Sequence, residues 1–203
     1  MEMLKYEDIK IFKDNLSSFK DTSRDSDGKA PKYMTNSEIQ VINFDKVKES
    51  YIKEMNLSDT PCSSDALYIG KEEKLFFIEF KNGVMKNNKI YNVYNEIYDS
   101  LLIFNDIVQK NISFCRENVY FVLVYNEEKN FCKKNEMKQQ DSSKIAISKH
   151  FHKKAKKKFI RFGLEKFEKI YFKGVFTYTE KEFEDNFLSK IDDNTHWDPE
   201  NLI

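Results

Sequence analysis

Apolar residues near the start of the chain recur at roughly helical spacing, which predicts a helix over residues 3–20. The polar, glycine-containing stretch 21–32 that follows predicts a loop. The apolar positions of this first helix are Leu4, Ile9, Ile11, Phe12, Leu16 and Phe19.

A second helix is predicted over about residues 36–56, where apolar residues fall on one face at about 100° per residue. Thr35 and Glu38 have the spacing of a capping box at its start. On the same count, the acids Glu38, Asp45 and Glu49 line one flank of the apolar stripe. We expect these acids to lie beside whatever the helix packs on.

Strand-like patterns follow in the middle of the chain. The segments DALYI at 65–69 and KLFFIEFK at 74–81 are separated by a polar turn, which predicts a β-hairpin. Residues 75–80 are apolar on both faces, which is typical of a central strand covered on two sides. A long helix is predicted over about 88–110, and another buried strand over 118–125.

The C-terminal third is more polar. Residues 126–143 have no period and predict a mobile excursion. Residues 144–190 predict a basic helix, a last strand and a short acidic helix, and residues 191–203 predict a loosely ordered tail.

The order of these elements is helix, hairpin, helix, strand, helix, strand, which predicts a single α/β domain over residues 1–203. We expect a central mixed sheet of about four strands flanked by helices, with an N-terminal helix and loop at 1–35 and the core at 36–125. Hydrophobic residues make up 40% of the chain, including 18 Phe and 11 Tyr, which separates it from disordered chains despite 33% charged residues.

Overall charge gives little direction, because 34 Lys and Arg balance 34 Asp and Glu. Any attraction to nucleic acid or membrane must therefore be local. No segment approaches the length and apolarity of a membrane span, so we expect a cytoplasmic protein without membrane contact. Cys62, Cys115 and Cys132 are odd in number and lack a short paired spacing, which argues against a disulfide framework and a zinc knuckle.

Three charged residues stand within the two most strand-like segments. Asp65 heads the first segment, and Glu79 and Lys81 lie near the end of the second, on one face of the strand. One interpretation is a solvated strand face that carries charges. The other is a metal site, because a hairpin can bring the two carboxylates together, and they repel unless a cation lies between them.

Hard oxygen ligands suit Mg²⁺ or Mn²⁺, which polarise a phosphoryl oxygen and lower the pKa of a bound water. Lys81 would then hold that water or offset charge on a phosphorane-like transition state. This combination is the chemistry of phosphodiester hydrolysis. The chain has no glycine-rich phosphate loop and no G-x-S-x-G motif to support nucleotide-triphosphate binding or acyl chemistry.

Asp65, fourteen positions before Glu79, together with Glu79-Phe80-Lys81 at the end of a strand, resembles the PD-(D/E)XK superfamily of restriction-endonuclease-like nucleases. The predicted order of helix, strand meander, helix and strand over about 36–125 is similar to that superfamily's core. The resemblance implies that Asp65 and Glu79 bind the metal and that Lys81 is the catalytic lysine. It also implies an acid from the first core helix, for which the candidates are Glu38, Asp45 and Glu49.

Two features depart from the superfamily's pattern. Ser64, and not a proline, precedes Asp65. Residues 57–64 also leave little room for the usual strand between the first core helix and Asp65.

A strongly basic run at 148–162 has two interpretations. It could neutralise several backbone phosphates of DNA or RNA, or it could be a solvated helix face balanced by the acidic segment 180–200. Its basic residues are Lys149, Lys153, Lys154, Lys156, Lys157, Lys158 and Arg161.

These observations favour a metal-dependent nuclease that cleaves DNA or RNA with Asp65, Glu79 and Lys81, with Glu49 or Glu38 as the added metal ligand. The resemblance further implies a homodimer, since many nucleases of this superfamily pair to cut both strands. The alternative is a non-catalytic relative that binds a protein, such as an immunity or antitoxin partner that neutralises a toxin. In a third interpretation, Lys81 merely pairs with one of the two acids in a structural domain.

Overall fold

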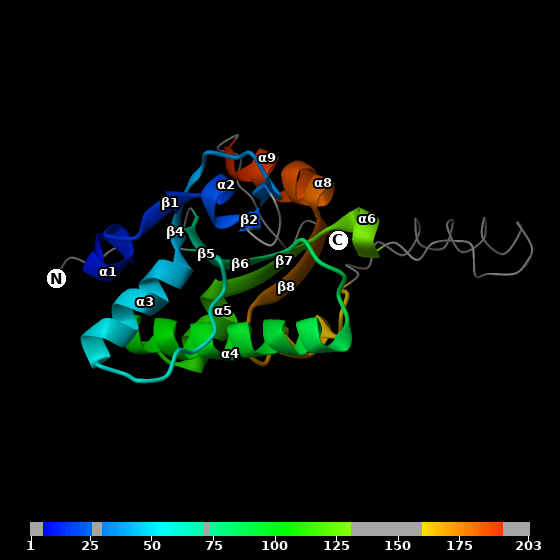
Figure 1. The fold of residues 1–203 in the computed structure, drawn as a ribbon. Helices are drawn as coiled ribbons and strands as arrows, with labels where there is room; N and C mark the ends of the chain where they lie inside the picture. The colour runs from blue at the N-terminus through cyan, green and yellow to red at the C-terminus, as the bar shows by residue number, and fades with distance from the viewer. Residues whose placement is uncertain (1–5, 26–29, 71–73, 131–159, 193–203) are drawn as a thin grey trace, which may run out of the picture.

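The computed structural model describes residues 6–25, 30–70, 74–130 and 160–192 (Figure 1). Most of the predicted excursion, the basic residues 149–158 and the predicted tail from residue 193 lie outside these described residues.

A six-stranded mixed sheet forms the centre of the molecule, in the order β1-β4-β5-β6-β7-β8. Neighbouring strands are antiparallel from β1 to β6 and parallel from β6 to β8. The α/β class and the mixed sheet were predicted, but the sheet is larger than the four strands expected. The strands are β1 (Leu16–Ser18), β4 (Gln40–Asn43), β5 (Ala66–Ile69), β6 (Leu75–Lys81), β7 (Val119–Tyr125) and β8 (Gly174–Thr179).

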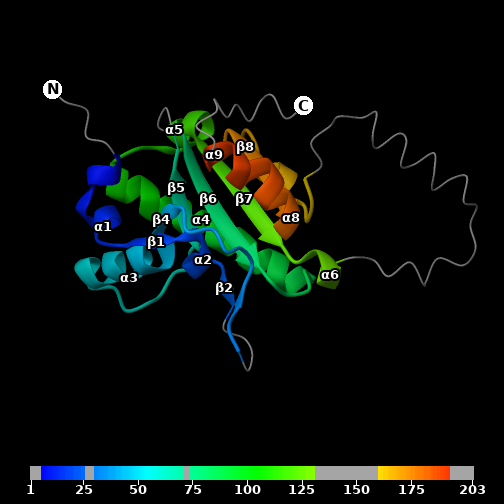
Figure 2. The ribbon, with the colours of Figure 1, turned by 90° about the horizontal axis from the view of Figure 1, so that it is seen from above.

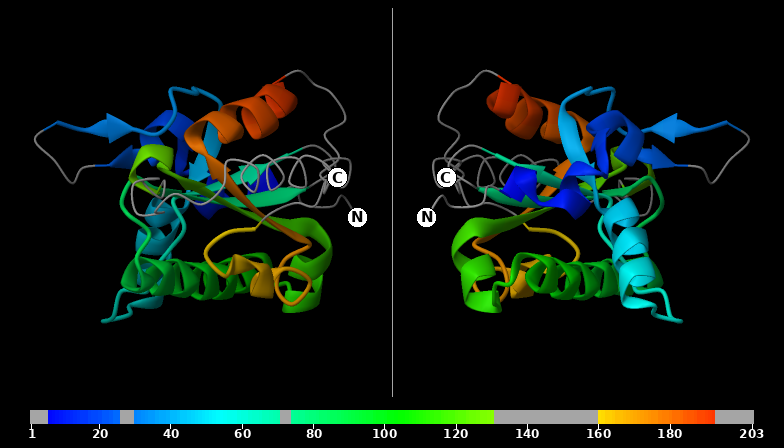
Figure 3. Two further views of the ribbon diagram at one scale, coloured as in Figure 1. Left: turned by 90° about the vertical axis from the view of Figure 1, so that its right-hand side faces the viewer. Right: turned by 90° about the vertical axis from the view of Figure 1, so that its left-hand side faces the viewer.

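A separate two-stranded hairpin is formed by β2 (Arg24–Asp25) and β3 (Lys32–Tyr33). It projects from the body of the molecule beside α2 (Figures 2 and 3).

Helices cover the sheet on both faces, with α4 below it and α8 and α9 above it in Figure 1. The N-terminal helices are η1 (Tyr6–Asp8), α1 (Lys10–Lys13) and α2 (Phe19–Thr22). The central ones are α3 (Phe44–Met55), α4 (Asn87–Val108), α5 (Ile112–Asn118) and α6 (Glu127–Asn130). The C-terminal ones are η4 (Leu164–Phe167), α8 (Glu180–Phe183), the π-helical turn η5 (Glu184–Leu188) and α9 (Ser189–Asp192).

Strand β6 is buried on both faces because each face meets a layer of helices. On the α4 side, the ring of Phe77 lies 5.6 Å from that of Phe104. On the other side, the ring of Phe76 lies 5.3 Å from that of Phe187 in η5. The prediction of a central strand at 75–80 is therefore confirmed.

The predicted helix over 3–20 is wrong beyond α1. Asn15 donates from its side-chain amide to the carbonyl of Ile11 (2.8 Å), and the chain then enters β1, which pairs with β4. Ser18 begins α2 by accepting a hydrogen bond from the N–H of Asp21 (3.2 Å). Polar side chains that bond to nearby backbone interrupt the helical pattern here.

The predicted helix over 36–56 starts eight residues late, at Phe44, because 40–43 form strand β4. Val41 and Ile42 are both buried, each in the apolar core on a different face of the sheet. The cap is Asn43, which accepts from the N–H of Lys46 (3.0 Å). Thr35 instead donates to Glu184 in η5 (2.5 Å). Packing on two faces thus overrides the helical spacing.

The other predicted elements agree more closely with the structure. The long helix α4 and the strands β7 and β8 lie where they were expected, and the acidic C-terminal helix begins with a capping box between Thr179 and Glu182. None of the helices among the described residues combines the length and the apolarity needed to cross a membrane.

Candidate functional site

Glu79 and Lys81 extend the row of β6 side chains that faces α4. Leu75 and Phe77 precede them in this row and pack in the apolar core beneath α4. The alternation of the strand therefore carries Glu79 into a buried position, where the residue is 1% exposed. A carboxylate in such a place is costly unless it has a partner.

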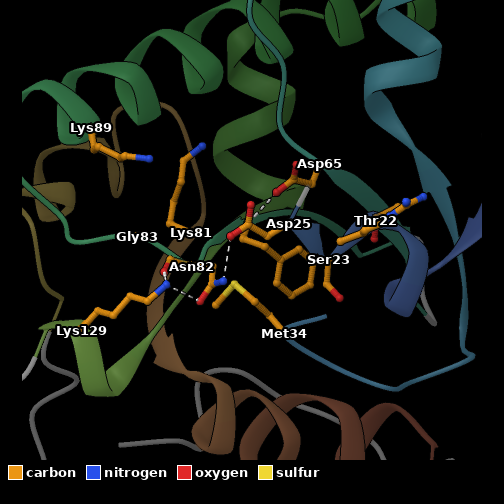
Figure 4. A pocket seen from close by; sticks show the side chains of 12 residues that line it. Thr22, Ser23, Asp25, Met34, Asp65, Lys81, Asn82, Gly83, Lys89 and Lys129 are labelled. Atoms are coloured by element: carbon orange, nitrogen blue, oxygen red, sulfur yellow. Dashed lines mark hydrogen bonds between the residues drawn. The ribbon is translucent and has the colours of Figure 1, made fainter. Parts of the chain in front are cut away.

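Asp65 lies directly before β5 and opposite Glu79, because Ala66 pairs with Ile78 in the antiparallel register. Its Oδ2 accepts a hydrogen bond from the N–H of Phe80 (2.6 Å) (Figure 4). The side chain of Asp65 thus takes the place of a backbone partner at the end of the strand pair. The hairpin register brings the two acids to one end of the sheet.

Lys81 lies between two carboxylates. Its Nζ is 2.5 Å from Oε1 of Glu79 and 2.9 Å from Oε1 of Glu96, which belongs to α4. Glu96 was missed in the sequence analysis. The signal was present, because Glu96 follows Val93 by three positions on the buried side of α4, where Ile97 and Ser100 also lie.

The segment before Asp65 is fastened to α4 by two hydrogen bonds. The N–H of Cys62 donates to Oδ2 of Asp99 (2.8 Å), and the N–H of Ser64 donates to Oγ of Ser100 (2.8 Å). These bonds fix the backbone that carries Asp65 at the start of its strand.

Of the three candidate acids from the first core helix, only Asp45 approaches the site. Its Oδ1 accepts from Oγ of Ser63 (2.5 Å), and its charge raises the pKa of Asp65. Glu38 lies before β4, is exposed and pairs with Lys20 (2.7 Å). Glu49 is exposed on α3. The structure therefore does not bring Glu38 or Glu49 to the other site residues, because the helix begins later than predicted.

Asp65 and Glu79 hold protons more tightly than usual. Burial raises the pKa of Asp65 from 3.8 to about 7, although Lys81 and the Phe80 N–H favour its charged form. Burial, and next the charge of Asp65, raises the pKa of Glu79 well above its ordinary value. Burial alone would lower the pKa of Lys81, but Glu79, Glu96 and Asp65 reverse this effect and raise it. Lys81 is therefore a permanent cation, and the site favours additional positive charge.

Two oxygens of the site support a place for a metal ion. Oε2 of Glu79 and Oε2 of Glu96 are buried, and within the described residues neither has a hydrogen-bond partner. Such orphaned acceptors are rare in folded proteins, and hard oxygen donors of this kind suit Mg²⁺ or Mn²⁺. Among the described residues, however, no group of three or more His, Cys, Asp or Glu is arranged to hold a metal, and the ammonium of Lys81 occupies the space between the two glutamates.

A pocket of about 390 Å³ opens beside the acids, with Asp65 and Lys81 in its wall (Figure 4). Glu79 lies behind this wall. The pocket makes the site accessible from outside, and three further basic side chains line it, together with the acid Asp25 and uncharged residues. The three basic residues are Arg24, Lys89 and Lys129.

The basic run can be placed only at its last residue. Lys149, Lys153, Lys154, Lys156, Lys157 and Lys158 lie outside the described residues. Arg161 donates from its backbone N–H to Oγ1 of Thr177 (3.0 Å), and its guanidinium lies 5.7 Å from the centre of the Tyr125 ring. Tyr125 pairs with Lys81 in the parallel register of β6 and β7. The basic run therefore joins the described fold near the carboxyl ends of β6 and β7, where Lys81 lies.

The site thus draws its charges from β6, from the residue before β5 and from α4, and it opens at the carboxyl end of β6. Comparison with protein-family models, with curated proteins and with solved structures finds no match to this chain.

Proposed function

We propose that the protein is a metal-dependent nuclease that hydrolyses phosphodiester bonds in DNA or RNA. The observation that carries the proposal is Glu79, a carboxylate buried in the central strand with one oxygen unpartnered among the described residues. Asp65 lies opposite it, Lys81 contacts it, and a basic pocket opens alongside. A buried, perturbed acid pair beside an accessible pocket is typical of a functional site.

The order of the core elements supports the same proposal. Strands β4, β5 and β6 form an antiparallel meander, α4 follows, and β7 then pairs in parallel with β6. This is the order of strand meander, helix and strand that the resemblance to the PD-(D/E)XK superfamily implies. Helix α3 lies between β4 and β5 in the chain, so the absence of a strand between α3 and Asp65 remains a departure from that superfamily's pattern.

In this mechanism, Asp65 and Glu79 would hold Mg²⁺ or Mn²⁺, with Glu96 as the third nearby acid. When bound, such an ion polarises a phosphoryl oxygen and lowers the pKa of water. Glu96 holds the ammonium of Lys81 in position through their 2.9 Å contact. Lys81 remains charged and offsets negative charge that develops on the phosphoryl group. The Phe80 N–H orients the Asp65 carboxylate toward the pocket.

A second candidate function is a non-catalytic binding protein, such as an immunity partner of a toxin. One observation favours it, because Lys81 already forms ion pairs with both Glu79 and Glu96, at 2.5 and 2.9 Å. A degenerate site of this kind would be stable without a metal ion.

Incubation of the protein with plasmid DNA and with RNA, in Mg²⁺ or Mn²⁺ and in EDTA, separates the two functions. We expect metal-dependent cleavage by the wild type and by Lys53→Ala, an exposed control on α3. Lys81→Met, which keeps the apolar stem and removes the charge, is expected to lose activity by about 10²-fold or more. A parallel thermal shift with Mn²⁺ reports metal binding directly, and we expect stabilisation of the wild type but not of Asp65→Asn.

Cleavage that persists in EDTA, or that is unchanged in Lys81→Met, would contradict the mechanism. A folded wild type that neither cleaves nor responds to Mn²⁺ would favour the binding protein.

A further inference from the structure

The pocket beside Asp65 is built by segments that are far apart in the sequence. Its walls come from α2 and β2, from the end of β6 and the turn after it, from the first turn of α4, and from α6. Figure 4 shows the end of Lys89 directed toward the side of the pocket where Lys81 lies, with Asp65 across from both. A volume of about 390 Å³ is enough for a phosphate and part of its sugar.

Two of the charged residues that line the pocket, Asp25 and Lys129, are engaged in hydrogen bonds within it. Asn82 donates from its side-chain amide to Oδ2 of Asp25 (2.7 Å) and accepts from Asn126 (2.9 Å). The ammonium of Lys129 donates to the backbone carbonyl of Asn82 (2.6 Å). These contacts join the hairpin strand β2, the end of β6 and α6 into one floor.

Two cations of the pocket remain without a side-chain partner among the described residues. They are Arg24, which is exposed on β2, and Lys89, in the first turn of α4. The first turn of α4 contains no acidic residue, so nothing there offsets the charge of Lys89. The pocket therefore presents more positive than negative side chains, with Arg24, Lys81, Lys89 and Lys129 against Asp25 and Asp65, beside an acid that the proposed mechanism uses.

The position of the Lys89 side chain depends on the absence of a side chain at Gly83. A Cβ on Gly83 would lie 3.2 Å from Nζ of Lys89 and 3.3 Å from its Cε. The absence of a side chain at Gly83 lets the lysine lie against the backbone at the rim of the pocket. The ammonium is thereby directed toward the space that Asp65 and Lys81 line.

We propose that this pocket binds the phosphodiester backbone of a polynucleotide, with Arg24 and Lys89 each contacting a phosphate next to Asp65 and Lys81. The identity of the anion rests on the proposed nuclease function. The binding is independent of base sequence, because backbone contacts fix the position of the chain and carry no base information. These contacts add to any made by the basic run at 149–161.

The test measures binding of a fluorescein-labelled single-stranded oligonucleotide by anisotropy, in EDTA and over a range of NaCl concentrations. Arg24→Ala and Lys89→Ala are each expected to reduce the slope of log K against log salt by about 0.7, equally for different sequences. Lys53→Ala is the matched control and is expected to keep the wild-type slope. Lys89→Arg keeps the charge and is expected to keep it as well.

An unchanged slope in Arg24→Ala and Lys89→Ala, or an equal loss in Lys53→Ala, would overturn the proposal, as would a wild type that does not bind the oligonucleotide. Loss of slope in Lys89→Arg would indicate a packing role for Lys89 and would overturn it too.

The binding assay and the cleavage assay test the two proposals independently, so that either proposal can be rejected without the other. Metal-dependent cleavage with an unchanged salt slope in the variants would contradict phosphate binding in the pocket but not the proposed nuclease function. Salt-dependent binding that requires Arg24 and Lys89, without metal-dependent cleavage by the wild type, would contradict the proposed hydrolysis but not phosphate binding in the pocket.

Discussion

Glu79 and Asp65 differ in their exposure and in the groups that stabilise their charge. Glu79 is enclosed and relies on Lys81, whereas Asp65 reaches the pocket and relies on the N–H of Phe80. The two acids lie close together, and the charge of Asp65 makes Glu79 harder to ionise. A second cation, such as the metal ion of the proposed mechanism, would relieve this repulsion.

The raised pKa of Asp65 predicts a pH dependence of stability. Its pKa is about 7 in the folded protein against an ordinary 3.8, so the folded state binds this proton more tightly than the unfolded chain. The stabilisation is fully present below about pH 4 and is lost as the pH rises toward about 7. Asp65→Asn, which stays uncharged, is expected to show a smaller fall in the free energy of unfolding over this range, as measured by urea denaturation.

Asp59→Asn, at an exposed position between α3 and β5, serves as the control and is expected to follow the wild type. An identical pH dependence in Asp65→Asn and the wild type would contradict the assignment of the proton to this carboxyl.

The elements that carry the site are joined by a few buried or part-buried hydrogen bonds. Helix α4 contributes Glu96 to the ion pairs and also holds the segment before β5 through Asp99 and Ser100. One helix thus positions both Lys81 and Asp65. A shift of α4 along the sheet would disturb both residues together.

Ser100→Ala tests this link. Ser64 and Ser100 are 0% and 1% exposed, so the substitution leaves the N–H of Ser64 buried without its acceptor. We expect the free energy of unfolding to fall by about 1–3 kcal/mol in denaturant titrations. Ser113→Ala, at an exposed serine of α5, is the matched control and is expected to stay within about 0.5 kcal/mol of the wild type. Equal stability of Ser100→Ala and the wild type would show that α4 does not hold this segment.

The sequence was sufficient to predict the elements with a strong period and the strand residues of the site. Alternation placed Glu79 and Lys81 on one face of β6, and the hairpin placed Asp65 opposite Glu79. It was not sufficient for β4, because Val41 fits a helical stripe with Phe44 as well as it fits a strand whose Val41 and Ile42 are buried on two faces. Glu96 was missed because its partner Lys81 lies 15 positions away, and such a contact depends on how α4 packs on the sheet.

At the scale of the whole molecule, the layer above the sheet is closed by aromatic contacts between distant segments. The ring of Phe187 lies 5.1 Å from that of Phe183, 5.3 Å from Phe76 and 6.1 Å from Phe19. This one side chain joins the C-terminal helices, the central strand and the N-terminal segment. The layer also covers the face of β6 opposite the acids.

Phe187→Ala is expected to destabilise the protein by about 3–5 kcal/mol, because a fully buried ring is removed from a packed cluster. Chemical denaturation measures the change, and Leu102→Ala is the control, since Leu102 is 69% exposed on α4 and should change stability by about 0.5 kcal/mol or less. A loss equal to that of Leu102→Ala would mean that the upper layer contributes little to the fold.

The parallel pairing of β6, β7 and β8 has a consequence for how the protein can diversify. The long connection from β7 to β8 leaves the described fold at Asn130 and re-enters it at Ile160, and Arg161 then lies against Tyr125 at the end of β7. Asn130 and Ile160, where that connection leaves and re-enters the described fold, are not among the paired residues of β7 and β8. Insertions, deletions and charge changes between them can therefore accumulate while Asp65, Glu79 and Lys81 keep their places, so that in the proposed nuclease the choice of target could evolve separately from the chemistry.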